Sequence, residues 1–486
     1  MGDLVKAEVD YELSPENFAH GMSSSRTGLG NSVFTYCWKA STLSWIFLLL
    51  ATPSVIFLAV CTPPFQSPDE VAHFERSYQI SQGGLYGGSG GSVDRGIDES
   101  FAPFSQLPFN PNAKVTEADE VAASGVKWTG EEVKHEFSNT ATYPPVGYLP
   151  QALGVALGRI AGLSVVHTLV LSRLLNGALA IFISTLALYL CQRGKLTMFA
   201  LLMMPMTLSL FGSCNQDASL ISITSLAFAL ISRHISEGPP LSWRMAVVLA
   251  SALLIVSLER PPLMMLLLVL LIPGILPGWG GKPAWLTGLS LVGLLAILVL
   301  VWWLVAFSST KVFVNTTPNG IVDARMQAQY MLRHPIVFPE AMIESVHHLP
   351  AYAAGIVGDL GWRDTRMPLP YYGVMLLMLL VALSAELICT STSRSSATVL
   401  VLLAVLSSII GVFLLEYLIW TQVGSGAVDG VQGRYLIPLI IAFSVGLPRL
   451  IRSDRGYHLA TVVVLLSQLL TFFYLPRVII ERYYLR

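Results

Sequence analysis

The sequence predicts an all-α polytopic membrane protein with about 11 transmembrane helices and two long external segments that contain interfacial helices. Of its 486 residues, 53% are hydrophobic and 12% are charged, and the mean hydropathy is +0.63. Soluble domains carry about 25% charged residues, so this chain has about half the usual share. Its apolar residues form runs of about 20, the length that crosses a hydrocarbon core, and only Glu416 places a charge within the longest runs. Lipid offers no partner to an open backbone, so these runs must be helices.

The predicted spans are set by the length of each apolar stretch and by the helix-breaking residues around it. They cover approximately residues 42–61, 167–191, 196–213, 218–235, 243–258, 263–277, 286–308, 371–390, 397–420, 435–449 and 458–475. A cytoplasmic N-terminus agrees with the positive-inside rule, because it places most short-loop cations inside. These cations are Arg193, Lys195, Arg233, Arg244, Lys282, Arg394, Arg449, Arg452 and Arg455. The tail arginines Arg477, Arg482 and Arg486 then lie outside, which counts against this orientation.

This orientation divides the chain into four parts. They are a cytoplasmic tail over 1–41, an N-terminal transmembrane module over 42–308, a second external segment over 309–370 and a C-terminal transmembrane module over 371–486. The N-terminal module includes the first external segment, residues 62–166. Within it, the apolar stretch 146–163 follows two prolines, and we expect a helix that lies in the outer interface.

Several function classes find no support in the sequence. The net charge of −1 and the lack of a basic stripe argue against nucleic-acid binding, and there is no Walker loop or dinucleotide fingerprint. The five cysteines lie mostly in or beside apolar runs, so we interpret them as buried hydrophobes. Glu344 and His347 share a helical face but have no evident third ligand, which favours a polar interfacial face over a metal site.

The densest polar cluster, residues 63–74, stands at the outer end of the first predicted span. Its adjacent carboxylates Asp69 and Glu70 repel each other beside the membrane, and like charge with partial desolvation primes one of them as a base. If Pro68 opens a helix, Asp69 and His73 are four residues apart and share a face. The alternative is an acidic pair that only complements the dipole at a helix start.

Arginines at membrane depth form a second signal. Arg173 lies inside an apolar run, Arg260 precedes two prolines at a span end, and Arg434 opens a span. Such a charge costs at least about 2.5–3.5 kcal/mol on insertion scales, so each arginine is expected to have a partner. The partner could be a carboxylate, such as Glu259 for Arg260 or Glu416, or a lipid phosphate, which a guanidinium binds in a bidentate manner.

Outer loops carry further candidates. Trp362 and Arg363 follow two glycines in one loop, a composition that suits a sugar or headgroup site and equally an interfacial aromatic belt. Residues 424–434 form a glycine-rich turn before the last two spans. Residues 213–217 form a third polar turn, in which we interpret Asp217 as the N-cap of the next helix.

These motifs, in this order, resemble a bacterial membrane-protein family known as domain of unknown function 2142. The matching stretches are 63–74 (PPFQSPDEVAHF), 143–145 (YPP), Arg173 with Asn176, 358–368 (GDLGWRDTRMP) and 430–438 (GVQGRYLIP). They extend over nearly the whole chain. That family in turn resembles a branch of the GT-C superfamily of membrane glycosyltransferases, in which a polyprenyl phosphate donates its sugar to an acceptor on the outer face.

The resemblance implies a GT-C-like fold and roles for particular residues. Asp69 stands where the superfamily has its catalytic carboxylate, and Glu70 stands at the second acidic position. The residues expected to bind the substrate or the lipid phosphate are His73, Arg173, Arg260, Trp362, Arg363, Gln432, Arg434 and Tyr435. Arg260 departs from the expected pattern, in which a lysine precedes the proline; the positive charge is kept while the headgroup geometry changes.

The resemblance thus implies an inverting glycosyltransferase in the inner membrane, with its active site on the extracytoplasmic side. Asp69 is the expected general base, and arginines are expected to hold the leaving phosphate. The expected partners are a polyprenyl-phosphate sugar, a glycan or glycolipid acceptor and membrane lipids, with no nucleic acid and no cofactor. A divalent metal on Asp69, Glu70 and His73 is an alternative to part of the arginine clamp. A lipid or polysaccharide transporter and a non-catalytic export subunit remain open as other function classes.

Overall fold

The structure is a computed structural model in which most of the chain after the N-terminal tail is described. The described residues are 41–88, 90–238, 240–278, 283–309, 314–317, 320–387, 395–448, 450 and 453–485. The predicted cytoplasmic tail, except for its last residue, lies outside this part of the chain. So do several cations of the predicted topology, namely Lys282, Arg394, Arg449, Arg452 and Arg486.

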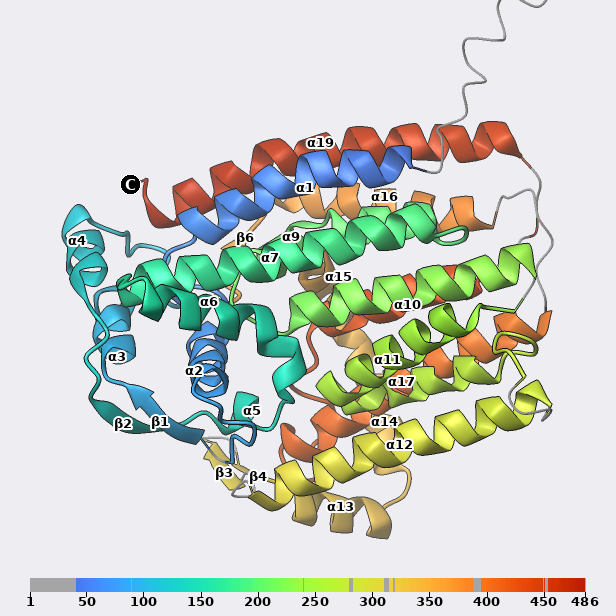
Figure 1. The fold of residues 1–486 in the computed structure, drawn as a ribbon, viewed down its shortest axis with the longest axis horizontal. Coiled ribbons are helices and arrows are strands. Elements are labelled where there is room, and N and C mark those ends of the chain that lie inside the picture. The colour runs from blue at the N-terminus through green and yellow to red at the C-terminus, as the bar shows by residue number, and fades with distance from the viewer. Residues whose placement is uncertain are drawn as a thin grey trace, which may run out of the picture.

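Within the described residues, seven helices are long and apolar enough to cross a membrane. They are α1 (Thr42–Cys61), α7 (Val165–Leu190), α10 (Asp217–Glu237), α12 (Ala284–Ser309), α16 (Leu369–Glu386), α17 (Ser395–Ile419) and α19 (Asp454–Tyr483). Figure 1 shows that most of them run in roughly the same direction. These helices confirm the predicted all-α, multi-pass membrane protein.

The remaining predicted spans are shorter or interrupted, so the count of about 11 spans is not confirmed. These elements are α8 (Lys195–Leu202), α9 (Pro205–Phe211), α11 (Trp243–Glu259), the 3-10 helices η4 (Pro261–Leu271) and η6 (Gly433–Leu436), and α18 (Ile437–Gly446). Proline explains two of the interruptions, because it lacks an N–H and disfavours a helical residue before it. Met204 and Arg260, which precede Pro205 and Pro261, have extended backbones.

Two elements hold the bundle together. Helix α7 packs against α1, α10 and α6 (Leu149–Ile160), and η4 packs against α11, α12 and α17. Glycine permits the close approach of α6 to α7, since a Cβ on Gly154 would lie 2.6 Å from the Cα of Ser172. A Cβ on Gly158 would lie 2.5 Å from the Oγ1 of Thr168. The start of α7 and the segment before it are therefore closely attached.

The first external segment lies at one end of the long helices (Figure 1). It contains α2 (Glu70–Ser81), β1 (Gly90–Asp94), α3 (Gly96–Phe101), η2 (Ala102–Phe104), α4 (Glu117–Gly125), β2 (Glu132–Glu136), α5 (Ser138–Ala141), η3 (Pro145–Tyr148) and α6. Strands β1 and β2 are antiparallel, with Val93 opposite Val133. Helix α6 has 12 residues, which is too short to span, and it exposes Leu149, Leu153 and Leu157. This geometry suits the helix that we expected in the interface.

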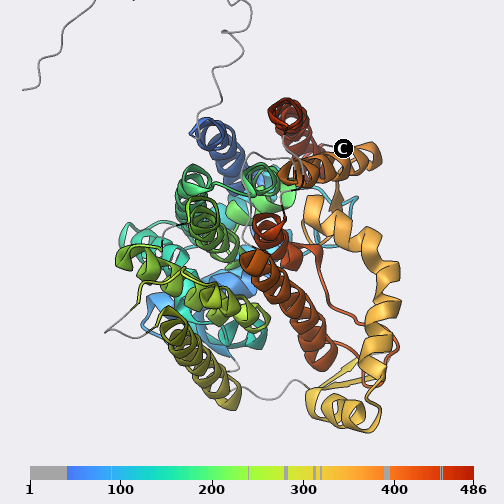
Figure 2. The same ribbon diagram turned by 90° about the vertical axis from the view of Figure 1, so that its right-hand side faces the viewer.

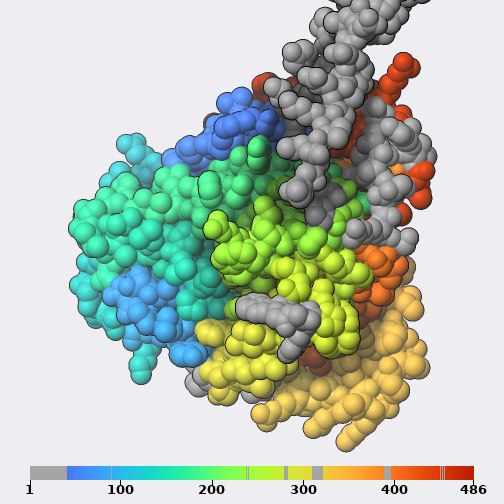
Figure 3. Space-filling view, turned by 45° about the vertical axis from the view of Figure 1, so that its right-hand side comes forward, coloured from blue at the N-terminus to red at the C-terminus, as the bar shows by residue number. Residues whose placement is uncertain are grey.

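The second external segment runs along one side of the bundle between α12 and α16 (Figure 2). It contains β3 (Val314–Thr317), β4 (Gly320–Asp323), α13 (Ala324–Arg333), α14 (Val337–Glu344), η5 (Ser345–His348), α15 (Leu349–Val357), β5 (Asp359–Leu360) and β6 (Thr365–Arg366). Leu332, Ile336 and Ile343 are exposed on it, as expected for helices at a membrane surface. Figure 3 shows parts of the first external segment, α12 and the second external segment on one face of the molecule.

The C-terminus is attached to both external segments. The N–H of Val115 donates to the carbonyl of Tyr483 at 2.8 Å. Arg482 donates to the carbonyl of Leu107 at 2.7 Å and to the carboxylate of Asp364 at 2.9 Å. The end of α19 and the two external segments therefore lie on the same side of the bundle.

A buried ion pair fixes the start of the first external segment to α7. Arg173 donates to Glu70 twice, from Nε to Oε1 at 2.8 Å and from Nη2 to Oε2 at 2.5 Å. Its other N–H groups donate to the carbonyls of Ala59, Thr62 and Pro63. The N–H of Cys214 also donates to Glu70, at 2.8 Å, and both charged side chains are buried. The pair joins α1, α2, α7 and the turn before α10.

Replacing Arg173 with methionine is expected to destabilise the protein by about 3–5 kcal/mol, because Glu70 would remain as a buried, unpaired carboxylate. Thermal unfolding in detergent measures this as a lowered midpoint. The matched control is Arg477→Met, which removes an exposed arginine from α19. The interpretation is wrong if the two variants unfold at the same temperature.

Candidate active site

A cavity with about 1290 Å³ of empty space lies between α2, the start of α10, the α11–η4 junction, α12, α17 and η6. We call it the large cavity. The predicted site residues that line it are Asp69, His73, Arg260, Gln432, Arg434 and Tyr435. They come from segments that are far apart in the sequence. The fold thus brings together most of the residues that the sequence indicated separately.

Asp69 occupies the N-cap position of α2 and faces the large cavity. Its backbone is in the left-handed region, with a φ of 59°, a conformation that aspartate adopts more readily than most residues. The helix turns its two adjacent carboxylates in different directions, so Glu70 is buried against Arg173 while Asp69 is 41% exposed. The Oδ2 of Asp69 lies 3.5 Å from the Nη2 of Arg434. This carboxylate is therefore both accessible and opposite a cation.

Arg434 is held in the wall of the cavity by its own backbone and by Asp217. The preceding residue, Gly433, is packed so closely that a Cβ would lie 2.1 Å from the carbonyl of Tyr352. The Nε of Arg434 lies 3.5 Å from Asp217, and no described residue accepts a hydrogen bond from this buried Nε. Both ion pairs of Arg434 are at the long limit of a hydrogen bond, so its N–H groups can bind an added anion.

Arg260 lies beside Arg434 and shares the same carboxylate. Its Nη2 donates to Asp217 at 2.9 Å, and its guanidinium lies 3.9 Å from the ring centre of Tyr435. The Nη1 of Arg260 is buried and donates to no described residue. The predicted alternative partner Glu259 accepts instead from Ser219, at 3.0 Å. The structure thus corrects that assignment, and Asp217 is the counter-charge of both arginines.

His73 lies one helical turn after Asp69, on the same face of α2. Its Nδ1 and the hydroxyl of Tyr148 are 2.7 Å apart. Burial lowers the pKa of His73 below its usual value, and this effect exceeds the opposite effect of Asp69 and Asp217. The lowered pKa favours the neutral imidazole, which can both donate and accept a hydrogen bond.

Part of the wall of the large cavity is apolar, and we call this part the apolar end. Trp303 and Phe307 line it from α12, and Val412, Leu415 and Ile419 line it from α17. Both helices belong to the membrane-spanning set, and α12 leaves most of its side chains exposed on the outside of the bundle. The wall of the cavity therefore combines charged side chains with apolar side chains from two of the spans.

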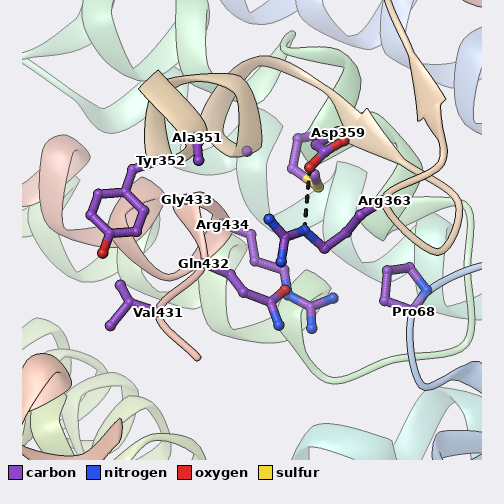
Figure 4. Close-up of a pocket in the computed structure, with 11 residues that line it drawn as sticks. Pro68, Ala351, Tyr352, Asp359, Arg363, Val431, Gln432, Gly433 and Arg434 are labelled. Carbon is purple, nitrogen blue, oxygen red and sulfur yellow. Dashed lines mark hydrogen bonds and ion pairs between the residues drawn. The ribbon is translucent and has the colours of Figure 1, made fainter. Parts of the chain in front are cut away.

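A second, smaller cavity of about 350 Å³ of empty space adjoins the first. Gln432 and Arg434 line both cavities, and Pro68, Asp359 and Arg363 line the small one (Figure 4). The predicted residue Arg363 thus lines the small cavity and not the large one.

The structure places three other predicted residues away from the large cavity. Glu70 and Arg173 bind each other in the interior, so their positions do not support the predicted catalytic and phosphate-binding roles. The Nε1–H of Trp362 donates to the carbonyl of Phe65 at 3.1 Å, which ties the second external segment to the loop before Asp69. These residues position the site and do not line its large cavity.

Sequence reasoning missed several residues of the large cavity. Asp217 was interpreted as an N-cap, but it is the first residue of α10 and its side chain makes no capping hydrogen bond. Tyr143 and Glu259 also line the cavity, together with Glu416, which was named only as a partner for an arginine. The polar run before Asp217 was the available signal, but sequence alone did not show that two distant arginines meet it.

The geometry does not favour a metal on the predicted ligands. Among the described residues, the His, Cys, Asp and Glu side chains that converge closely enough for a metal are Glu75, Asp98 and His135. Glu70 is engaged by Arg173, so Asp69, Glu70 and His73 form no such group. Glu344 and His347 are exposed and 3.8 Å apart. This distance fits the polar interfacial face that the sequence favoured.

No curated protein and no solved structure matches the chain. The model of one protein family, described as predicted membrane protein (DUF2142), matches residues 53–443. This match extends from α1 to α18 and includes the residues that line both cavities. The chain therefore belongs to the DUF2142 family of predicted membrane proteins.

Proposed function

We propose that this membrane protein is a glycosyltransferase that moves a sugar from a polyprenyl phosphate to an acceptor hydroxyl. In this proposal Asp69 is the general base, and Arg260 and Arg434 bind the phosphate. The reaction occurs on the outer face of the inner membrane. The observation that carries the proposal is that Asp69 stands opposite Arg434 in a cavity that apolar side chains of α12 and α17 also line.

The shape of the large cavity suits a ligand with a charged head and a hydrocarbon chain. Its head would bind beside Arg260 and Arg434, each of which has a buried nitrogen that makes no hydrogen bond to a described residue. A phosphate accepts several hydrogen bonds from guanidinium groups and balances their charge. The chain would lie along Trp303 and Phe307 toward the lipid that surrounds α12. A free sugar or a nucleotide would make no use of this apolar end.

The proposed reaction needs few protein groups. The acceptor oxygen attacks the anomeric carbon of the donor sugar, and Asp69 takes the proton from the acceptor hydroxyl. The bond between the anomeric carbon and the phosphate oxygen breaks, and its electron pair leaves on the phosphate. Fixed positive charge stabilises that leaving phosphate, and attack from the opposite side inverts the anomeric centre.

The residues around the phosphate have separate tasks in this proposal. Asp217 keeps both guanidinium groups in place, since its two oxygens contact Arg260 and Arg434. Tyr435 packs its ring against Arg260 and so orients that guanidinium. Because Asp217 is already engaged by both arginines, Asp69 is the better candidate for the base: its carboxylate is more exposed and contacts one arginine, at 3.5 Å.

Asp69→Asn is expected to lower sugar transfer by about 10²–10⁴-fold, the usual contribution of a general base. Binding of the polyprenyl phosphate should be nearly unchanged, because the amide keeps the size of the side chain. The assay measures sugar transfer by purified protein from polyprenyl-phosphate sugars to an acceptor pool from a cell lysate.

The matched control is Asp429→Asn, which changes an exposed aspartate of the turn before Arg434 that lines neither cavity. Performing the assay in detergent removes the second compartment that a transporter needs. Equal transfer by wild type and Asp69→Asn would eliminate the assigned base. No transfer by wild type with any donor would favour a transporter or an export subunit.

Leu415→Trp is expected to weaken binding of a long-chain polyprenyl phosphate by about tenfold, because a larger side chain fills the apolar end of the cavity. Binding of farnesyl phosphate should change less, since its short chain reaches less of that end. The control is Leu406→Trp, which enlarges an exposed position on the same helix. If both variants change the binding of both ligands equally, the apolar end does not bind the lipid chain.

A further inference from the structure

We propose that the small cavity is a second anion-binding subsite, which receives a phosphate or carboxylate group next to the phosphate in the large cavity. This inference rests on the proposed function, because it assigns a further part of the same substrates. Two sources have the required chemistry. One is the second phosphate of a diphosphate-linked donor, and the other is an acidic group on the acceptor.

The small cavity concentrates donors of hydrogen bonds to an anion. Figure 4 shows the side chains of Arg363, Gln432 and Arg434 converging on the same space, with Asp359 behind Arg363. Arg363 uses its Nε for Asp359, at 3.3 Å, and the described residues give its terminal nitrogens no hydrogen-bond acceptor. A guanidinium that is held through Nε presents its two terminal N–H₂ groups, which suits bidentate binding of a phosphate or carboxylate.

Positive charge exceeds negative charge around the small cavity. Arg363 and Arg434 line it, and Asp359 is the carboxylate of its wall. Asp359 also forms an ion pair with Arg366, whose Nε lies 3.5 Å from the Oδ1 of Asp359. Two guanidinium groups that share one small space repel each other, and an anion between them removes that repulsion.

The turn that carries Arg363 is held in an uncommon conformation. Arg363 has a φ of 66°, in the left-handed region that non-glycine residues rarely adopt. Gly361 has a φ of 61°, and a Cβ there would lie 2.4 Å from the Oδ1 of Asp364. Asp364 is buried and bonded to Arg482. A strained residue that displays a charge into a cavity is typical of a binding site.

The position of the small cavity connects it to the proposed reaction. Pro68 lines the small cavity and its neighbour Asp69 lines the large one. Gln432 and Arg434 line both, so the two cavities are separated by the side chains that would bind the first phosphate. An anion in the small cavity is therefore a chemical group directly beside that phosphate or beside the acceptor hydroxyl.

The experiment measures binding of farnesyl phosphate and farnesyl diphosphate to the full chain in detergent. If the donor supplies the anion, wild type binds the diphosphate about tenfold more tightly, and Arg363→Gln removes this preference without weakening the monophosphate. A second arm compares galacturonate with galactose in the presence of farnesyl phosphate. If the acceptor supplies the anion, wild type prefers the acid in this arm and Arg363→Gln loses that preference.

The matched control is Arg366→Gln, because Arg366 also contacts Asp359 but lines neither cavity. Equal unfolding temperatures of both variants and wild type show that the turn is intact. Loss of either preference in Arg363→Gln alone supports the subsite. The subsite is refuted if Arg363→Gln behaves as wild type in both arms, or if Arg366→Gln has the same effect. Failure of wild type to bind farnesyl phosphate would instead contradict the proposed function.

Discussion

The contact of Asp217 with two arginines is the interaction on which the site depends. Arg260 and Arg434 are both buried, and each would repel the other without the carboxylate between them. The backbone beside each arginine is restrained, because two prolines follow Arg260 and the closely packed Gly433 precedes Arg434. These three charged side chains line the large cavity together with Asp69.

The sequence was sufficient to locate the long apolar helices and insufficient for the interrupted spans and for the pairing of charges. Helices such as α1 and α17 could be located because a long apolar run in lipid must satisfy its own backbone hydrogen bonds and therefore forms a helix. The stretch after Arg260 was taken for another span, whereas its two prolines begin a 3-10 helix. Arg260 was paired with its neighbour Glu259, although the nearest carboxylate in space comes from a residue 43 positions away in the chain. Distances of this kind depend on helix packing, which local periodicity does not encode.

The adjacent acidic residues show how one motif serves two purposes. The sequence treated Asp69 and Glu70 as one catalytic pair, but successive residues of a helix point in different directions. Glu70 forms a buried ion pair with Arg173, which also donates to three backbone carbonyls. This ion pair anchors the loop that holds Asp69. The left-handed backbone of Asp69 then directs the second carboxylate into the cavity. A motif search that requires both acids therefore detects one carboxylate that faces the cavity, Asp69, and one that anchors the loop, Glu70.

The attachment of the C-terminus has a consequence for the biosynthesis of the protein. Arg482 and Tyr483 make hydrogen bonds to Leu107, Val115 and Asp364, which the ribosome produces much earlier. These contacts can therefore form only after α19 has been synthesised, however early the first helices insert.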